Sequence, residues 1–362
     1  MKKNITITVT NDIATDNRMH KTAISLLNAG FNVKIIGMKK KNTPKFSRPY
    51  TTKLLKLFFY KTWLFYANYN IAVFFNLLFC KVDILLSVDL DSLLANYLVA
   101  KIRRKKLVYD SHELFTELPE LVHRPKTKLF WQKIEKFILP KLKNSYTVCQ
   151  SIANYYNQKY NIQMSVVRNV PFYSKFKSIV KNQNPKIIIY QGSLNKGRGI
   201  EEMIEAMQYL ENYIFWIIGD GYLSDDLKKL AKHFQLEQKV VFIPKLPVEK
   251  LPYYTIQAHL GISFEKNISL NYYYALPNKI FDYVQASVPV LCSDLPEMKK
   301  IVEDFQVGEI LVSHKPQQIA IQIQQIFNDE QKLSHWQKNL QIAKSQLIWE
   351  NEQQILLQNF VD

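Results

Sequence analysis

Two glycine-containing turns carry the residue types that bind phosphate groups. In the segment Tyr190-Gln-Gly-Ser-Leu-Asn-Lys-Gly-Arg-Gly-Ile, a strand pattern passes through a turn into a helical pattern. Such a turn presents backbone N–H groups and the positive end of a helix to an anion, and Lys196 and Arg198 add charge suited to a diphosphate. An ordinary strand-to-helix turn with solvated basic side chains explains the segment equally well, since it matches neither Gly-x-Gly-x-x-Gly nor the Walker pattern.

The second turn, Gly219-Asp-Gly221, follows the strand pattern at Trp216 and brings backbone close to any adjacent ligand, although a simple turn also explains it.

A third segment places a carboxylate where a ribose could bind. After Pro277 we expect a helix capped by Asn278, with Lys279 beside it and Asp282 one turn inside. A carboxylate there can accept hydrogen bonds from both hydroxyls of a ribose, as acidic residues do in dinucleotide sites. Alternatively, Asp282 only favours the positive end of the helix.

A fourth segment ends a strand with polar side chains. Leu107-Val-Tyr-Asp-Ser-His-Glu-Leu carries Asp110, His112 and Glu113 at the carboxyl end of its strand pattern. Ligands bind at that end of parallel strands, so we expect His112 to hydrogen-bond a sugar hydroxyl or a leaving group. A histidine with a purely structural role is the alternative.

The elements that position these residues belong to two unlike halves. The chain has 362 residues, which favours two domains, and a formal net charge of +17. Residues 1–170 hold 28 Lys and Arg against 10 Asp and Glu, whereas five of the nine glycines fall within 192–221. Three widely spaced cysteines exclude a disulfide scaffold and a cysteine zinc cluster, and they favour a reducing cytosol.

Strand and helix patterns alternate along both halves, which predicts an α/β fold of two doubly wound parallel sheets. A polar linker at 174–185 separates them, and residues 38–53 are expected to form a loop. The start of the chain lacks the pattern of a signal peptide. The apolar stretch 62–80 contains three asparagines, which favours a buried or interfacial helix over a membrane-spanning one.

Taken in order, these segments resemble the group 1 retaining glycosyltransferases (glycosyltransferase family 4). The resemblance covers nearly the whole chain. It rests on five matching segments: Asp12-Ile-Ala-Thr-Asp-Asn-Arg-Met; Val88-Asp-Leu-Asp with Tyr109-Asp-Ser-His-Glu; Gly192 with Arg198-Gly199; Gly219-Asp-Gly221; and Leu276-Pro-Asn-Lys-Ile-Phe-Asp-Tyr with Val288-Pro-Val.

The resemblance implies a GT-B fold, in which two Rossmann-like domains face a cleft. Residues 1–172 would form the acceptor domain, residues 173–337 would form the donor domain, and a C-terminal helix at 338–362 would cross back to the first. A long helical pattern at 336–360 agrees with that assignment.

The resemblance also assigns roles to individual residues. His112, Arg198 and Lys196 would be catalytic, with Arg198 neutralising the donor diphosphate. The implied donor-binding residues are Gly192, Ser193, Arg198, Gly199, Gly219, Gly221, Asn278, Lys279 and Asp282. The implied acceptor-side residues are Asp16, Arg18, Asp89, Asp91, Asp110 and Glu113.

The chain departs from the family pattern at three positions. The family pattern has two glutamates, and this chain has Tyr274 in place of the first and Asp282 in place of the second. Ser193 replaces an arginine, and Ser287 replaces a glycine before the Val288 strand.

The implied reaction moves a sugar, of the hexosyl type, from a nucleotide-sugar to a saccharide acceptor with retention at the anomeric carbon. A UDP-sugar is favoured and a GDP-sugar is the alternative. Cations and helix N-termini can stabilise the departing diphosphate, so neither a metal nor a cofactor is predicted.

The basic half would be the acceptor side. Lys39–Lys41, Arg103–Lys106 and the aromatic basic stretch Lys53–Tyr66 suit an anionic membrane surface. We therefore expect a cytoplasmic protein, peripheral on the inner face of a bacterial plasma membrane, that uses a lipid-linked saccharide in polysaccharide synthesis. A merely solvated basic face is the alternative.

Three other functions remain open from the sequence. The basic half is compatible with nucleic-acid binding, although it contains no nucleic-acid-binding motif. We do not expect a nucleic acid as a partner. A nucleotide-sugar epimerase shares the two-domain architecture. A non-catalytic binding module would explain the tyrosine at position 274.

Overall fold

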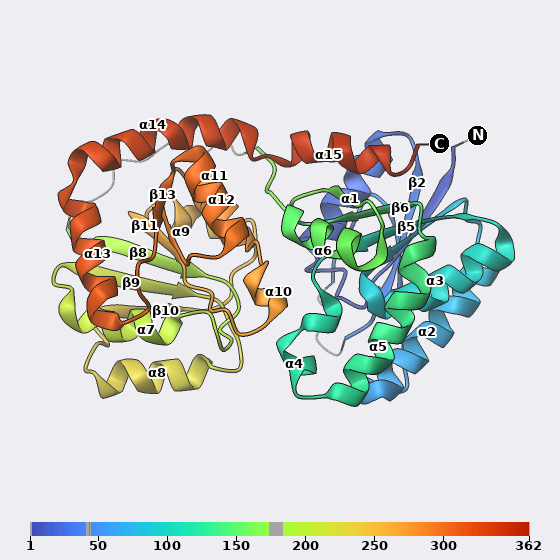
Figure 1. Cartoon of the computed structure of the whole chain (residues 1–362), viewed down its shortest axis with the longest axis horizontal. Helices are drawn as coiled ribbons and strands as arrows, with labels where there is room; N and C mark the ends of the chain where they lie inside the picture. Colours follow the sequence, from blue (N-terminus) through green and yellow to red (C-terminus); the bar gives the residue numbers. More distant parts are fainter. Residues whose placement is uncertain (1, 41–42, 44, 174–183, 362) are drawn as a thin grey trace. The chain divides into compact units, whose positions relative to one another are not determined.

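The computed structural model describes residues 2–40, 43, 45–173 and 184–361 (Figure 1). The chain forms two compact units: unit 1 is Met1–Asn169 with Asn351–Asp362, and unit 2 is Val170–Glu350. Lys41 and most of the linker expected at 174–185 lie outside the described residues.

Unit 1 contains a seven-stranded sheet whose strand pairs are all parallel. Its strands in spatial order are β3 (Thr51–Leu55), β2 (Asn32–Met38), β1 (Asn4–Thr8), β4 (Ile84–Val88), β5 (Lys106–Ser111), β6 (Asn144–Thr147) and β7 (Ser165–Val166). Its helices are α1 (Asn17–Asn28), α2 (Thr62–Phe79), α3 (Asp89–Arg103), α4 (Pro119–Val122), α5 (Pro125–Ile138), α6 (Gln150–Tyr160) and most of α15 (Trp349–Gln358).

The central strand of unit 1 sets the place of its polar residues. β4 is buried along its whole length, because helices cover both faces of a parallel sheet. In its register with β5, Val88 lies opposite Asp110. Asp89, the next residue, therefore lies at the same sheet edge as His112.

Unit 2 contains a six-stranded sheet, again with parallel pairs throughout. Its strands in spatial order are β10 (Val240–Ile243), β9 (Tyr213–Ile218), β8 (Lys186–Gln191), β11 (Leu260–Ser263), β12 (Val290–Cys292) and β13 (Gly308–Ile310). Its helices are α7 (Ile200–Ala206), α8 (Ser224–His233), α9 (Leu251–Thr255), α10 (Leu270–Tyr273), α11 (Asn278–Gln285), α12 (Pro296–Phe305), α13 (Pro316–Asn328) and α14 (Glu330–Gln346).

Successive side chains along a strand point to opposite faces of the sheet, so apolar strands in unit 2 pack against a helix layer on each face. Leu260 and Ile262 belong to the core cluster formed with α7, α8 and α13. Gly261 points the other way, and a Cβ there would lie 2.4 Å from the Tyr283 ring on α11. The expected α/β class with two doubly wound parallel sheets is thus confirmed.

Three local expectations are wrong. The end of the expected loop 38–53 belongs to β3, an edge strand whose outer residues are exposed and therefore polar. The long helix expected at 336–360 is two helices, α14 and α15, because the chain turns at Leu347 and the Trp349 N–H donates to Pro171 O at 2.8 Å. The crossing to the first domain was expected from residue 338, but α14 lies in unit 2 and the chain enters unit 1 only at Asn351.

The apolar stretch 62–80 forms α2. One side of this helix, at Tyr69, Val73 and Leu77, is buried against unit 1. Among the described residues, no helix has the length and apolar character needed to cross a bilayer.

Candidate functional site

The two glycine turns of unit 2 form one backbone-packed structure. The Gly192 N–H donates to Ile218 O at 3.0 Å, and the Leu194 N–H donates to Asp220 O at 3.0 Å. A Cβ on Gly219 would lie 1.9 Å from the carbonyl oxygen of Gly192, and one on Gly221 would lie 2.4 Å from that of Leu194. Only glycine allows this approach, so the sequence pattern has a packing reason as well as the functional one proposed from the sequence.

A buried carboxylate that the sequence analysis missed lies behind the first turn. Glu265 follows β11 and is completely buried. Its Oε1 accepts hydrogen bonds from Lys279 Nζ at 2.6 Å and Arg198 Nη1 at 3.2 Å, and its Oε2 accepts one from Ser263 Oγ at 2.6 Å. Two cations predicted to bind donor therefore meet at one carboxylate.

The charges of this cluster are fixed by their mutual attraction. Burial raises the pKa of Glu265, but Lys279 and Arg198 outweigh it, and the net pKa lies below the usual range. Burial lowers the pKa of Lys279, and Glu265 offsets this only in part. Burial also lowers the pKa of Arg198, but here Glu265 outweighs it and the net pKa is raised. With all three groups ionised, the cluster carries one net positive charge.

Aromatic rings flank both cations. Lys279 Nζ lies 4.3 Å from the centroid of the Tyr190 ring, and the Arg198 guanidinium lies 4.7 Å from that of Tyr272. Rings at these distances stabilise a cation and limit where it can move.

Asp282 lies beside a cavity of about 380 Å³ in unit 2. Its Oδ2 accepts a hydrogen bond from Gln191 Nε2 at 2.8 Å, and Gln191 Oε1 accepts one from Thr255 Oγ1 at 2.8 Å. The cavity is lined by these polar groups and by apolar side chains that include Phe172 and Pro252. Its size is in the range of small-molecule sites.

The other donor-side residues predicted from the sequence lie at the start of α11 and in the first glycine turn. Asn278 is the first residue of α11 and does not cap it: Pro277 occupies the N-cap position, where no side chain caps the helix. The expected cap is wrong because Asn278 lies inside the first turn, and the proline side chain at the N-cap position has no oxygen to accept a hydrogen bond. Lys196 and Ser193 are exposed, and the Lys196 N–H donates to Tyr222 Oη at 2.8 Å.

Two departures from the family pattern acquire structural context. Tyr274 directly follows the short helix α10, and Glu265 provides a carboxylate elsewhere on the same connection between β11 and α11. Ser287 has φ +55°, a left-handed conformation that a glycine adopts without strain. The signal for Glu265 was available in the sequence: an acidic residue two positions after a buried strand.

Unit 1 gathers its own charged cluster at the carboxyl ends of β4 and β5. Asp110 accepts two hydrogen bonds from the buried Arg18, at 2.9 and 3.2 Å. His112 Nε2 lies 3.0 Å from Asp110 Oδ2. The His112 N–H donates to Asp89 Oδ1 at 2.8 Å, while its Nδ1 lies 3.6 Å from Asp89 Oδ2. Both ring nitrogens of His112 therefore face carboxylates within unit 1.

Burial and charge shift the pKa values of this cluster in opposite directions. Burial lowers the pKa of His112, but Asp110 and Asp89 outweigh it and raise that pKa to about 9. Burial raises the pKa of Asp110, whereas Arg18 and His112 bring it down to about 2. Burial and the neighbouring carboxylates raise the pKa of Asp89. His112 is thus an imidazolium at neutral pH.

The other acceptor-side residues divide into two kinds. Asp16 caps α1, accepting a hydrogen bond from the Met19 N–H at 3.0 Å, which is a structural role. Asp91 is buried, accepts a hydrogen bond from Thr10 Oγ1 at 2.7 Å, and has a pKa raised to about 7, chiefly by burial. Glu113 is half-buried, and its charge contributes to the raised pKa values of Asp89 and Asp91.

Within the ranges that the structure describes, no group of three His, Cys, Asp or Glu side chains is arranged to hold a metal ion. The two donor-side cations that the structure brings together, on Glu265, are Arg198 and Lys279. Such an arrangement can bind and neutralise a diphosphate.

Residues 172–342 match the model of the family described as glycosyl transferases group 1. No curated protein matches the chain significantly. Among solved structures, sucrose-phosphate synthase from Thermosynechococcus elongatus superposes with a TM-score of 0.81 at 16% identity, covering 99% of this chain and 98% of that one.

Two further structures cover the chain almost completely. HepE from Anabaena, solved in complex with UDP, has a TM-score of 0.74 at 13% identity, with 99% of each chain covered. WaaG, a glycosyltransferase involved in lipopolysaccharide biosynthesis, has a TM-score of 0.75 at 11% identity, with 97% of this chain and 98% of that one covered. At such identities the likeness establishes the fold, which is GT-B.

Proposed function

Residues 172–342 belong to the group 1 glycosyltransferases, and on that premise we propose that unit 2 binds a nucleoside diphosphate sugar, with UDP favoured over GDP as its nucleotide. The transferase would belong to family 4, act with retention at the anomeric carbon and move a hexosyl group. The observation that carries the proposal is the pair of cations, Arg198 and Lys279, held on one buried carboxylate.

The net charge of that cluster fits a diphosphate. Glu265 offsets one of the two positive charges, so a positive charge remains for the ligand. Because the rings of Tyr190 and Tyr272 limit the movement of the cations, their positions are set before the ligand arrives. Preorganised positive charge lowers the barrier to departure of a diphosphate. The proposal therefore assigns this task to side chains and requires no metal or cofactor.

The cavity beside Asp282 is the proposed nucleoside site. Asp282 would accept hydrogen bonds from the ribose hydroxyls, as the resemblance implies, and the apolar side chains that line the cavity would contact the base. HepE, which shares the fold, was solved with UDP bound. This supports the choice of UDP.

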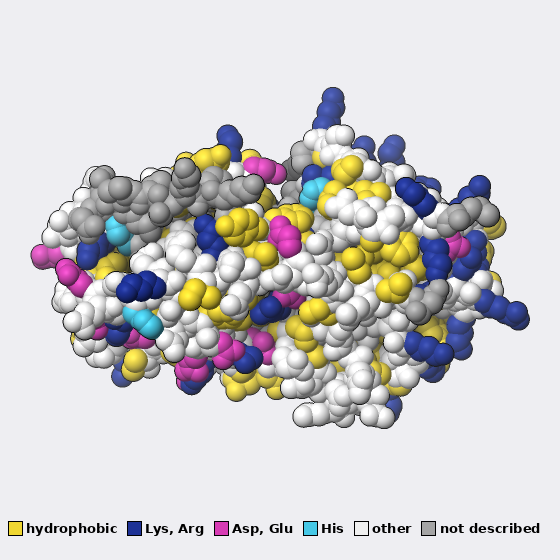
Figure 2. Space-filling model, turned by 90° about the horizontal axis from the view of Figure 1, so that it is seen from above, with side chains coloured by type: hydrophobic (Ala, Val, Ile, Leu, Met, Phe, Trp, Pro, Cys, Tyr) yellow, Lys and Arg dark blue, Asp and Glu magenta, His cyan; other side chains and the backbone are white. Residues whose placement is uncertain are grey.

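The proposed acceptor is a saccharide, in a lipid-linked form, used in the synthesis of a cell-surface polysaccharide. Figure 2 shows one face of the molecule on which Lys and Arg side chains gather over unit 1, at the right. Several apolar side chains of α2 are also exposed, among them Trp63, Phe75 and Phe79. We propose that this basic unit associates with the inner face of the plasma membrane.

His112 would contact the transferred sugar. As an imidazolium it can only donate hydrogen bonds, so a sugar hydroxyl would have to replace its weaker contact with Asp89, at 3.6 Å, to be bound. Arg18 would hold Asp110, and through it His112, in place.

A two-step experiment tests the function. UDP-, GDP-, ADP- and CMP-sugars are screened for an increase in melting temperature, and the sugar product from the best donor is then analysed by proton NMR. We expect a UDP-sugar to stabilise the protein and the transferred or hydrolysed sugar to keep its anomeric configuration.

Each other outcome has a distinct meaning. No stabilisation by any nucleotide-sugar contradicts the donor site, and inversion contradicts the retaining mechanism. Conversion of the donor sugar without any release of UDP would identify an epimerase instead. Absence of salt-sensitive flotation with anionic liposomes would contradict the membrane association.

A further inference from the structure

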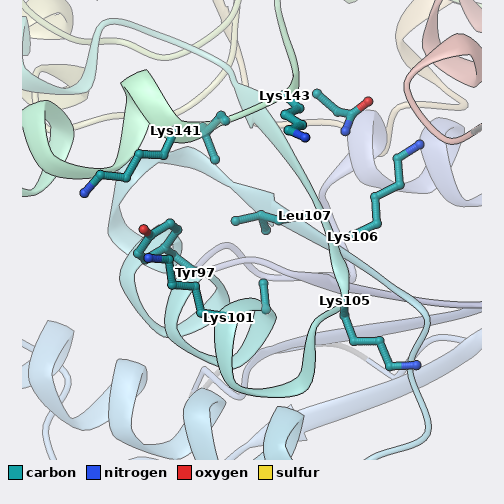
Figure 3. Close-up of a pocket in the computed structure, with 10 residues that line it drawn as sticks. Tyr97, Lys101, Lys105, Lys106, Leu107, Lys141 and Lys143 are labelled. Carbon is teal, nitrogen blue, oxygen red and sulfur yellow. The ribbon is translucent and has the colours of Figure 1, made fainter.

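A second cavity, in unit 1, is surrounded by lysines. It has a volume of about 360 Å³, and five lysines line it together with apolar side chains (Figure 3). The lysines are Lys101, Lys105, Lys106, Lys141 and Lys143. They come from the end of α3, the start of β5 and the segment before β6. Residues far apart in sequence thus bring like charges to one cavity.

This cavity is separate from the charged cluster of unit 1. It lies where β5 begins, at Lys106, whereas Asp110 and His112 lie where β5 ends. A strand of six residues spans roughly 20 Å at about 3.3 Å per residue. The lysines therefore do not belong to the site that contains His112.

Three of the five lysines have no carboxylate partner among the residues that the structure describes. Lys105 pairs with Asp83 at 3.1 Å, and Lys106 Nζ donates to the carbonyl oxygen of Val361 at 2.6 Å. In the part of the chain that the structure describes, no carboxylate pairs with Lys101, Lys141 or Lys143. Repulsion among unpaired like charges costs stability, and a bound anion removes that cost.

The floor of the cavity is apolar. Tyr97 is 5% exposed, and Ala100, Leu107 and Leu142 also line the space. Lys101 Nζ lies 5.4 Å from the centroid of the Tyr97 ring, whereas Lys141 Nζ lies 5.9 Å from that centroid and 3.3 Å from the centroid of the Phe137 ring. A ligand that fits would combine an anionic group with a part that contacts this floor.

We infer that this cavity binds a phosphate group carried on an organic substituent. Lysine ammonium groups are point charges that suit phosphate oxygens, and several of them around one space favour a multiply oxygenated anion. The phosphate could be that of an anionic lipid headgroup or of a free phosphate ester. The neighbouring helices α3 and α5 also expose apolar side chains, namely Leu98, Ile102 and Phe137. Apolar side chains of this kind would contact the acyl chains of a lipid. The inference stands apart from the donor site of unit 2.

Acetylation footprinting locates the bound phosphate. The full chain is treated with an acetylating reagent in the presence of glycerol 3-phosphate, phosphatidylglycerol vesicles or phosphatidylcholine vesicles, and each lysine is quantified by mass spectrometry. We expect acetylation of Lys101, Lys141 and Lys143 to fall at least about fivefold with glycerol 3-phosphate, with phosphatidylglycerol or with both. Protection by the ester identifies a soluble ligand, and protection by phosphatidylglycerol alone identifies a lipid headgroup.

A variant pair then tests whether the cavity, rather than general positive charge, is responsible. Lys141→Gln with Lys143→Gln should weaken binding of the protecting ligand on the order of 30-fold, since each lysine contributes to phosphate attraction. The matched control, Lys228→Gln with Lys232→Gln on α8, removes the same charge from unit 2 and should leave binding within about twofold.

The inference is overturned if neither ligand protects the three lysines, or if both double variants weaken binding equally. Thermal stabilisation by UDP is measured on each variant in parallel. Because the cavity lies outside unit 2, UDP stabilisation should persist in the Lys141→Gln, Lys143→Gln variant. Loss of the donor site would therefore be recognised separately from loss of the phosphate cavity.

Discussion

Lys279 Nζ lies 2.6 Å from Oε1 of Glu265, and the two side chains are 7% and 0% exposed. A buried ion pair of this kind is expensive to break, because removal of one partner leaves the other charged without compensation. Glu265 also receives Arg198, so a single carboxylate organises both cations that we assign to the donor diphosphate.

Glu265→Gln should therefore destabilise unit 2 by about 3–5 kcal/mol, because it leaves Lys279 and Arg198 close together without a counter-charge. Denaturant unfolding measures this loss. Glu303→Gln, at an exposed position of α12, is the matched control and should change the free energy of unfolding by less than about 0.5 kcal/mol.

The double variant Glu265→Gln, Lys279→Met separates lost charge compensation from lost packing. Removing the uncompensated lysine should recover part of the stability lost in Glu265→Gln alone. If the two substitutions are additive, the pair does not act as a unit and this description of the cluster is wrong.

Gly219→Ala should disrupt the donor turn. A Cβ at Gly219 would lie 1.9 Å from the carbonyl oxygen of Gly192, so one of the two turns must move. We expect loss of thermal stabilisation by UDP together with a loss of about 3 kcal/mol or more in stability.

Gly30→Ala provides the control for backbone strain. Gly30 also has a positive φ, +91°, but no atom lies within 4 Å of its added Cβ. It should cost only about 1–2 kcal/mol and leave UDP binding intact. Equal effects of the two substitutions would show that strain, and not the close approach of the two turns, dominates at Gly219.

The imidazole of His112 should titrate near pH 9 instead of near 6.5, which NMR of labelled histidine can measure. Asp110→Asn should lower that pKa, because it removes the largest attractive charge. Titration of wild-type His112 near 6.5 would contradict the ion-paired geometry.

The same shifts set the pH dependence of unit 1. The folded-state pKa of His112, about 9, exceeds its ordinary value of 6.5, so its stabilisation is complete below about pH 6.5 and is lost as the pH rises through 9. The folded-state pKa of Asp110, about 2, is below its ordinary 3.8, so its stabilisation is present above pH 3.8 and is lost as the pH falls through 2. His112→Gln should flatten the alkaline part of the stability profile.

The sequence predicted those parts of the fold that depend on local pattern. Buried strands such as β4 and β9 are apolar runs between turn residues, and the glycines at 192 and 219 mark turns that only glycine can form. β3 escaped prediction because an edge strand buries few side chains and has a polar sequence. The break between α14 and α15 is set by packing at Leu347 and Trp349, which periodicity does not reveal.

The candidate site was predicted only in part, because some of its residues follow local patterns and others are brought together only by the tertiary structure. Arg198, Lys279 and Asp282 follow recognisable turns and helix starts. Glu265 was missed because its importance lies in meeting two cations from distant segments, at positions 198 and 279. The lysine cavity likewise depends on tertiary structure, since α3, β5 and the segment before β6 each contribute to it.

The central claim is that Arg198 binds the diphosphate of a UDP-sugar, and calorimetric titration of UDP into wild type, Arg198→Lys and Arg198→Ala tests it most directly. We predict that wild type binds UDP, that Arg198→Lys keeps most of the affinity, and that Arg198→Ala loses about 10- to 100-fold, the value of a charge-assisted hydrogen bond. Equal affinity of wild type and Arg198→Ala for UDP, or no binding of UDP by wild type, would contradict the claim.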